Sequence, residues 1–168
     1  MKNTRFALLF VALLLLPSTM MAQLQRSQDF KGKYQLKEVV ILSRHNIRAP
    51  LSDNGSALGR LTPHAWTHWS SGASELTTRG GVLETMMGQY FRKWVVTEGL
   101  FKENAVPTAS EVNFYANSMQ RTIATAQYFS SGFMPLANLH INHRYTASKM
   151  DPVFTPRLTK LSEAFKQE

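Results

Sequence analysis

A short apolar segment that ends in a cluster of positive charge constrains the fold of this chain more than any other feature. Residues 39–42 are Val-Val-Ile-Leu, and Ser43 separates them from the motif Arg44-His45-Asn46-Ile47-Arg48-Ala49-Pro50. A nearly continuous apolar run of this length is typical of a strand that is covered on both faces. We therefore predict a buried strand over residues 36–43 that opens into a loop carrying two arginines and a histidine.

The residue types in this loop suit phosphate chemistry. An arginine is a fixed cation whose planar fork fits phosphate oxygens. Positive charge on both sides of His45 disfavours the protonated imidazole, so the ring should present a neutral, nucleophilic nitrogen. Ligands of α/β folds bind beyond the carboxyl ends of strands, where this loop is expected. The motif predicts phosphoryl transfer through a covalent phosphohistidine, without a metal or another cofactor. A basic loop with a structural histidine is the alternative.

The rest of the chain alternates between strand-like and helix-like patterns. Strands are predicted at residues 112–116 and 139–142, and helices at residues 79–98 and 118–130. Residues 49–77 have no clear periodicity, and Asp53-Asn54-Gly55-Ser56 is typical of a turn. The alternation predicts an α/β fold with a parallel-type sheet flanked by helices.

The first predicted helix has recognisable ends and an apolar stripe. Thr78 is a plausible N-cap, and Gly99 is placed to end the helix. Apolar residues recur at helical spacing and predict a face packed into the core: Val82, Leu83, Met86, Met87, Tyr90, Phe91, Trp94 and Val95. Arg79 has two interpretations, as a surface residue of the first turn or as part of a pocket rim.

Arg121 falls in the first turn of the second predicted helix. At that position its guanidinium and the free backbone N–H groups could face the same anion. The alternative is an ordinary solvated cation on a helix surface.

Taken together, these motifs resemble the histidine acid phosphatase family, the acid branch of the histidine phosphatase superfamily. Besides the Arg-His-x-x-Arg-x-Pro motif, the resemblance includes the segments Leu76–Gly81, Ala116–Thr122 and Met150–Pro156. It implies His45 as the residue that takes the phosphoryl group, and Arg44, Arg48 and Arg121 as phosphate ligands. It covers nearly all of this chain but only the N-terminal part of the family's histidine-phosphatase-like domain.

The resemblance implies an acid phosphomonoesterase acting on small phosphate esters. The sequence is most similar to the bacterial periplasmic members that act on sugar phosphates such as glucose 1-phosphate. Asn46 supports this, because phytase-type members usually have glycine at that position. Phytase-type activity on inositol phosphates and a phosphate-binding remnant without turnover stay as alternatives. The Arg48-Ala49-Pro50 continuation argues against a mutase of the related branch.

The proton donor is the missing part of this site. A positioned acid–base group contributes about 10² to 10⁴ in rate. The resemblance implies a His-Asp or similar pair near the family's C-terminus, and no His-Asp dipeptide occurs in this sequence. We therefore expect an incomplete domain whose proton donor is not present in this chain and whose activity is open. Asp151 precedes Pro152 and is interpreted as a turn former rather than a substitute acid.

The N-terminal residues predict export. Lys2 and Arg5 precede an apolar stretch over residues 6–16, and Ala22 is a plausible last residue of a signal peptide at 1–22. The stretch is too short to span a bilayer core of about 30 Å. Residues 23–168 would then form the incomplete phosphatase domain, periplasmic and not bound to a membrane.

Charge, cysteine and histidine usage exclude other classes. Removing Lys2 and Arg5 lowers the net charge from +8 to +6, but the positive residues are scattered and no aromatic-basic platform is visible, so nucleic acid is not a predicted partner. The chain has no cysteine, whereas members of the resembled family often carry disulfides. His64 and His68 would share a face of a helix starting at Pro63, but no third ligand accompanies them, so no metal site is predicted. The oligomeric state is left open.

Overall fold

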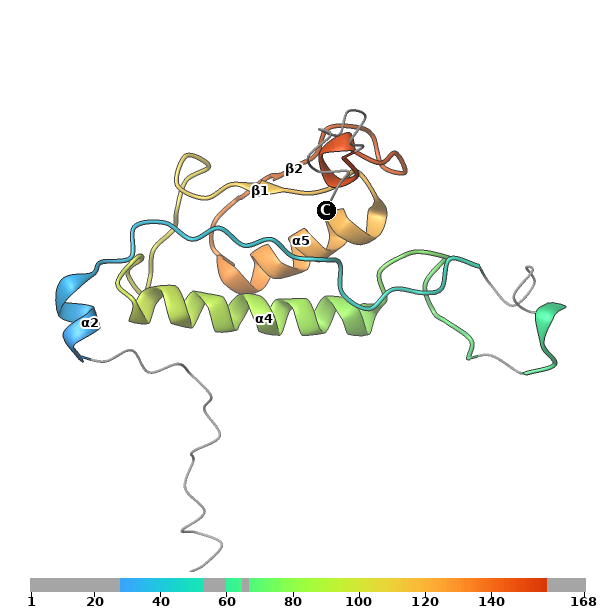
Figure 1. Cartoon of the computed structure of the whole chain (residues 1–168), viewed down its shortest axis with the longest axis horizontal. Helices are drawn as coiled ribbons and strands as arrows, with labels where there is room; N and C mark the ends of the chain where they lie inside the picture. Colours follow the sequence, from blue (N-terminus) through green and yellow to red (C-terminus); the bar gives the residue numbers. More distant parts are fainter. Residues whose placement is uncertain (1–27, 53–59, 65–66, 157–168) are drawn as a thin grey trace, which may run out of the picture. The chain divides into compact units, whose positions relative to one another are not determined.

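The computed structural model describes residues 28–52, 60–64 and 67–156. The chain divides into two compact units, Met1–Gln35 and Leu36–Glu168. The described element of the first unit is helix α2 (Gln28–Lys33). The second unit contains, in chain order, α4 (Thr78–Thr97), β1 (Phe114–Tyr115), α5 (Gln120–Phe133), β2 (Ile141–Asn142) and the 3₁₀ turn η1 (Pro152–Phe154), as Figure 1 shows. The predicted signal peptide at 1–22 and the predicted turn at 53–56 lie outside the described residues.

None of the helices in the described ranges is both long enough and apolar enough to cross a membrane.

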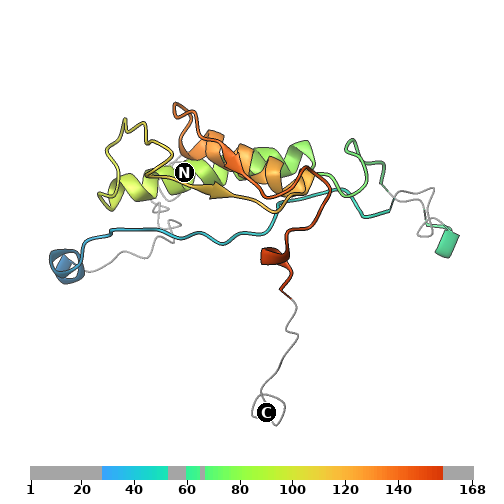
Figure 2. The same cartoon turned by 90° about the horizontal axis from the view of Figure 1, so that it is seen from above.

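A parallel β-α-β unit is the centre of the fold. Phe114 of β1 lies opposite Ile141 of β2, and the N–H of Ala116 donates to the carbonyl of Asn142 at 2.8 Å. Helix α5 connects the two strands and contacts both, as a parallel pair requires (Figures 1 and 2). The predicted α/β class and parallel sheet are confirmed, although both strands are shorter than predicted.

The strand predicted at residues 36–43 is wrong. These residues form neither helix nor strand, and Val40 and Leu42 are 85% and 90% exposed. Val39 alone among the apolar residues of this segment packs against the core cluster. A strand exists only where a neighbour pairs its backbone groups, and no described segment pairs with this one. The sequence pattern shows the apolar run, but it does not show whether another segment pairs with the backbone of that run.

Helix α4 starts one residue earlier than predicted. The N-cap is Thr77, not Thr78, since the Thr77 hydroxyl accepts from the N–H of Gly80 at 3.0 Å. Gly99 follows the helix with a φ of +76°, a conformation that favours glycine, so the predicted end is confirmed.

Helices α4 and α5 pack backbone against backbone. A Cβ atom on Gly88 would overlap the backbone of Phe129 and Phe133, and one on Gly132 would overlap the backbone of Thr85. Glycine therefore permits this close approach. The first five of the eight residues in the predicted apolar stripe are exposed rather than packed in the core: Val82, Leu83, Met86, Met87 and Tyr90.

The core lies at the other end of these helices. Val95 packs with Phe129, Phe133 and Met134, and the partly buried residues around them include Phe91, Trp94 and Phe114. The predicted core position of Phe91, Trp94 and Val95 is therefore correct. This core fixes α5 against α4 and so places the start of α5 next to the arginine-rich loop.

Candidate active site

The arginine-rich loop is held by the segment that leads into α4. The N–H of Ala49 donates to Glu75 O at 2.8 Å, and the N–H of Thr77 donates to Ile47 O at 2.9 Å. Arg48 and Leu76 form an antiparallel bridge between these hydrogen bonds. Three backbone positions of the loop, Ile47, Arg48 and Ala49, are thereby fixed to the segment before a helix rather than to a sheet.

The N-cap of α4 strengthens this connection. The Thr77 hydroxyl that accepts from Gly80 also donates to Ile47 O at 2.9 Å. A Cβ atom on Gly80 would overlap that same carbonyl oxygen. The first turn of α4 therefore lies directly against the loop.

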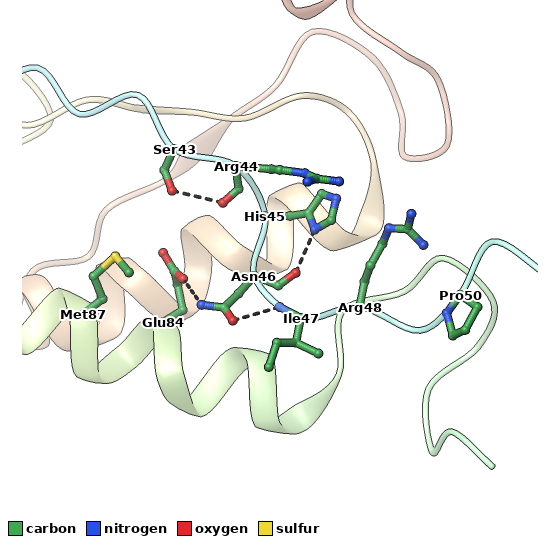
Figure 3. Close-up of a pocket in the computed structure, with 9 residues that line it drawn as sticks. All are labelled: Ser43, Arg44, His45, Asn46, Ile47, Arg48, Pro50, Glu84 and Met87. Carbon is green, nitrogen blue, oxygen red and sulfur yellow. Dashed lines mark hydrogen bonds between the residues drawn. The ribbon is translucent and has the colours of Figure 1, made fainter. Parts of the chain in front are cut away.

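A cavity opens over this loop (Figure 3). Arg44, His45 and Arg48 line it, and their side chains project to one side of the loop; Glu84 also lines it, from the other side of Asn46. The remaining lining residues are Ser43, Asn46, Ile47, Pro50 and Met87. Three of the four site residues predicted from the sequence thus share one cavity.

The ring of His45 has a defined tautomer. Its Nδ1 lies 2.8 Å from the carbonyl oxygen of Asn46. A carbonyl can only accept, so Nδ1 carries the hydrogen and Nε2 of the neutral ring keeps its lone pair. The pKa of His45 is lowered below its ordinary value, mainly because burial penalises the charged ring, and further by Arg121, Arg44 and Arg48. The predicted neutral nucleophile matches this electrostatic environment, although burial lowers the pKa more than any single arginine does.

Arg121 belongs to the same charge cluster. It is the second residue of α5, a helix whose N-cap, Met119, provides no side-chain hydrogen bond. Burial lowers the pKa of Arg121, and the positive charges of Arg48 and Arg44 lower it further. Its Nη1 donates to the Ser74 hydroxyl at 2.8 Å, while its buried Nε has no partner among the described residues. The structure therefore brings Arg121 close enough to His45 and the other two arginines for their charges to interact.

Arg79 does not join this cluster. It is an exposed residue in the first turn of α4 and is not among the residues that line the cavity. Of its two interpretations, the structure favours the surface residue.

Glu84 is a residue of the site that was not predicted from the sequence. This residue of α4 is 2% exposed, and its Oε2 accepts a hydrogen bond from Asn46 Nδ2 at 2.6 Å. The N–H of Asn46 donates to the Thr125 hydroxyl at 3.3 Å, which in turn donates to Arg121 O at 2.7 Å. Asn46 thus connects the loop to both helices. The sequence signal was limited to an acidic residue inside the predicted apolar stripe of α4, and it did not indicate Asn46 as the partner.

Two other predictions are settled outside the cavity. Asp151 is fully buried and caps η1 through the N–H of Val153 at 3.0 Å, so the turn former is confirmed. Residues 62–64 and 67–69 are not helical, so the helix predicted from Pro63 is wrong where the structure describes it. No group of three or more His, Cys, Asp or Glu side chains suited to a metal occurs within the described ranges.

Comparisons with known proteins agree with this geometry. Residues 35–162 match the model of the histidine phosphatase superfamily, branch 2. The chain is 43% identical over 168 residues to a glucose-1-phosphatase of Salmonella typhimurium, covering 100% of this chain and 40% of that protein. A glucose-1-phosphatase of Providencia rettgeri is 43% identical over 143 residues, covering 84% of this chain and 34% of that protein.

A solved structure shows the same fold over most of the chain. It is the phytase of Hafnia alvei in complex with myo-inositol hexakis sulphate, 36% identical with a TM-score of 0.64, covering 71% of this chain and 29% of that one. The chain thus spans between a third and two fifths of the length of these curated relatives.

Proposed function

The chain belongs to branch 2 of the histidine phosphatase superfamily, and from this premise we propose that it carries the nucleophile and phosphate pocket of an acid phosphomonoesterase. One observation supports this proposal most strongly. Three guanidinium groups gather around a partly buried imidazole whose Nδ1 is occupied and whose Nε2 is available. Such a cluster of cations is unfavourable by itself and favours an anionic ligand.

In the proposed first step, Arg44, Arg48 and Arg121 bind the oxygens of a phosphate monoester. Their charges stabilise the negative charge of the transition state. The lone pair of His45 Nε2 attacks phosphorus, a P–N bond forms, and the P–O bond to the alcohol breaks with its electron pair on that oxygen. In the second step, the oxygen of a water molecule forms a bond to phosphorus, the P–N bond breaks with its electron pair on Nε2, and phosphate leaves with both protons of the water.

The described site does not provide an obvious proton for the departing alcohol. The acidic side chain among the described cavity residues is Glu84, which is buried and already hydrogen-bonded to Asn46. We therefore propose that the described residues bind phosphate and provide the nucleophile, and that a group outside this set supplies the proton. A substrate with a good leaving group should need little such assistance.

Sugar phosphates such as glucose 1-phosphate are the proposed substrates, since two relatives at 43% identity are named glucose-1-phosphatases. Inositol phosphates are the second candidate, because the similar solved structure is a phytase. The proposed compartment is the periplasm, on the strength of the signal-peptide pattern at residues 1–22.

Trapping the intermediate tests the proposed chemistry. The full chain is mixed with ³²P-labelled 4-nitrophenyl phosphate and quenched, and the expected label is stable in base and labile in acid. His45→Ala should abolish labelling. The matched control is His143→Ala, because the His143 Nδ1 also bonds to a backbone carbonyl, that of Tyr145, at 2.7 Å. Equal labelling of the His45→Ala variant would refute the proposed nucleophile.

The binding step has its own measurement. Phosphate should raise the thermal midpoint of the chain, because a ligand that binds only the folded state stabilises it. Arg121→Ala should remove this increase, whereas Arg79→Ala should keep it. The two arginines form a matched pair, since each is the second residue of its helix. Phosphate protection without any labelling would favour the alternative of a binding module without turnover.

A further inference from the structure

A continuous series of hydrogen bonds runs from a buried carboxylate to the imidazole of His45 (Figure 3). Asn46 Nδ2 donates to Glu84 Oε2 at 2.6 Å. The N–H of Ile47 donates to Asn46 Oδ1 at 2.8 Å. The carbonyl of Asn46, in the same peptide unit as that N–H, accepts from His45 Nδ1 at 2.8 Å. Three hydrogen bonds thus join Glu84 to His45 through one side-chain amide and one peptide.

In each of these three hydrogen bonds, the donor is the group nearer to His45 along the series and the acceptor is the group nearer to Glu84. Negative charge on Glu84 polarises the Asn46 amide and makes its Oδ1 a stronger acceptor. That oxygen polarises the 46–47 peptide, whose carbonyl becomes a stronger acceptor for the Nδ1 hydrogen of His45. Hydrogen bonds in such a chain strengthen one another, by about 10–30% per bond. The effect at the far end is more electron density on the ring and a more nucleophilic Nε2.

Glu84 has few other roles open to it. It is 2% exposed, and within the described residues its hydrogen-bond partner is the Asn46 amide rather than a cation. The charged groups that act on the pKa of His45 through space are Arg121, Arg44 and Arg48, and Glu84 is not among them. The hydrogen bond to the Asn46 carbonyl raises the pKa of His45, in opposition to burial and to the three arginines.

We propose that Glu84 is a positioning residue that acts on His45 through Asn46. It fixes the 46–47 peptide, selects the tautomer with hydrogen on Nδ1, and keeps Nε2 basic enough to attack phosphorus amid three cations. A carboxylate that bonds directly to a histidine fixes the ring and raises its basicity. Here the carboxylate acts in the same way, but the Asn46 amide and the 46–47 peptide lie between it and the ring. The role of Nε2 as a nucleophile in this inference rests on the proposed function, but the series of hydrogen bonds can be tested without substrate.

The test is ¹⁵N NMR of the full chain with labelled imidazole rings, with the His45 signals assigned through His45→Gln. In the wild type, His45 should carry hydrogen on Nδ1 and none on Nε2 above its pKa. Glu84→Gln keeps an oxygen acceptor for Asn46 but removes the charge, so the pKa of His45 should fall and the Nδ1 proton resonance should move upfield. Asn46→Ala breaks the series while keeping the charge, and should act in the same direction.

A double variant separates this proposal from a through-space effect. Because both substitutions interrupt one series, Glu84→Gln with Asn46→Ala should change the pKa of His45 no more than the larger single effect. Glu75→Gln is the matched control, since it removes one negative charge beside the loop but outside the series, and should leave the His45 signals unchanged.

Several results would overturn the proposal. They are a wild-type ring with hydrogen on Nε2, an unchanged His45 pKa in Glu84→Gln, or additive effects in the double variant. If Asn46→Ala does not fold, the wild-type tautomer and Glu84→Gln still decide the question. A chain that shows the expected NMR behaviour but no trapped phosphohistidine would contradict the proposed function and leave this inference standing.

Discussion

At the scale of the single residue, His45 combines a partly buried ring with three neighbouring cations. Each of these features destabilises imidazolium, because a charged ring loses hydration on burial and is repelled by guanidinium groups. The site therefore keeps the ring neutral at a pH where a free histidine is already charged. That property links the chemistry of the site to the stability of the fold.

The linkage predicts how stability depends on pH. The pKa of His45 is lowered from 6.5 in the folded chain, so the unfolded chain binds more protons between 6.5 and the folded value. Stability should therefore fall as the pH drops through this window, and the contribution of His45 should vanish above it. Urea unfolding in a buffer free of phosphate, at pH 7.5 and pH 5.5, measures this.

The His45→Gln variant serves to isolate the effect. Between pH 7.5 and pH 5.5, the unfolding free energy of the wild type should fall more than that of the His45→Gln variant. His140→Gln, at an exposed site, is the control. A difference between wild type and His45→Gln that does not change with pH would contradict the lowered pKa.

The sequence could predict some of these site residues and not others, for physical reasons. Arg44, His45 and Arg48 lie within five positions, so any conformation keeps them near one another. Predicting Arg121 as a site residue required the start of a helix after a strand, and the local sequence pattern indicated both. Glu84 was out of reach because its partner, Asn46, is 38 positions away, and nothing local shows which carboxyl will meet which amide.

At the scale of elements, the start of α4 is a structural part of the site. The Thr77 hydroxyl bonds to the first turn of the helix and to the carbonyl of Ile47, next to Arg48. The close approach at Gly80 keeps the helix against the same carbonyl. A change in the cap should therefore affect both helix stability and phosphate binding.

Replacing this cap gives a prediction with a matched control. Thr77→Ala should lower the unfolding free energy by about 1 to 2 kcal/mol, because it removes the buried N-cap hydrogen bond and a second, partly buried one to Ile47 O. Phosphate protection of the thermal midpoint should also weaken, since Arg48 loses its support. Thr78→Ala changes an exposed neighbour and should stay within about 0.5 kcal/mol of the wild type. A larger loss in Thr78→Ala than in Thr77→Ala would instead show that Thr78 is the cap, as the sequence alone predicted.

At the scale of the whole molecule, connections close in sequence were predictable and distant ones were not. The β1-α5-β2 unit arises from neighbouring segments, and its parallel pairing follows from a helical crossover. The backbone contact of α4 with α5 depends on Gly88 and Gly132, two residues more than 40 positions apart, and apolar periodicity does not report it. For the same reason the apolar run at 39–42 predicted a strand whose partner is absent from the described residues.

The exposed apolar segment before the site leads to a final prediction about the chain as a whole. Val40 and Leu42 are 85% and 90% exposed, whereas Val39 packs against the core. Contiguous exposed apolar side chains favour association, so the chain should self-associate as its concentration rises, measured by sedimentation velocity. Replacing both Val40 and Leu42 by Thr should reduce that association and change the unfolding free energy by less than about 1 kcal/mol, since surface changes cost little. Val39→Thr should destabilise the fold more than the double change does, because it places a hydroxyl against the core. If the double variant instead loses several kcal/mol, these two side chains are buried in solution, and the strand predicted from the sequence exists after all.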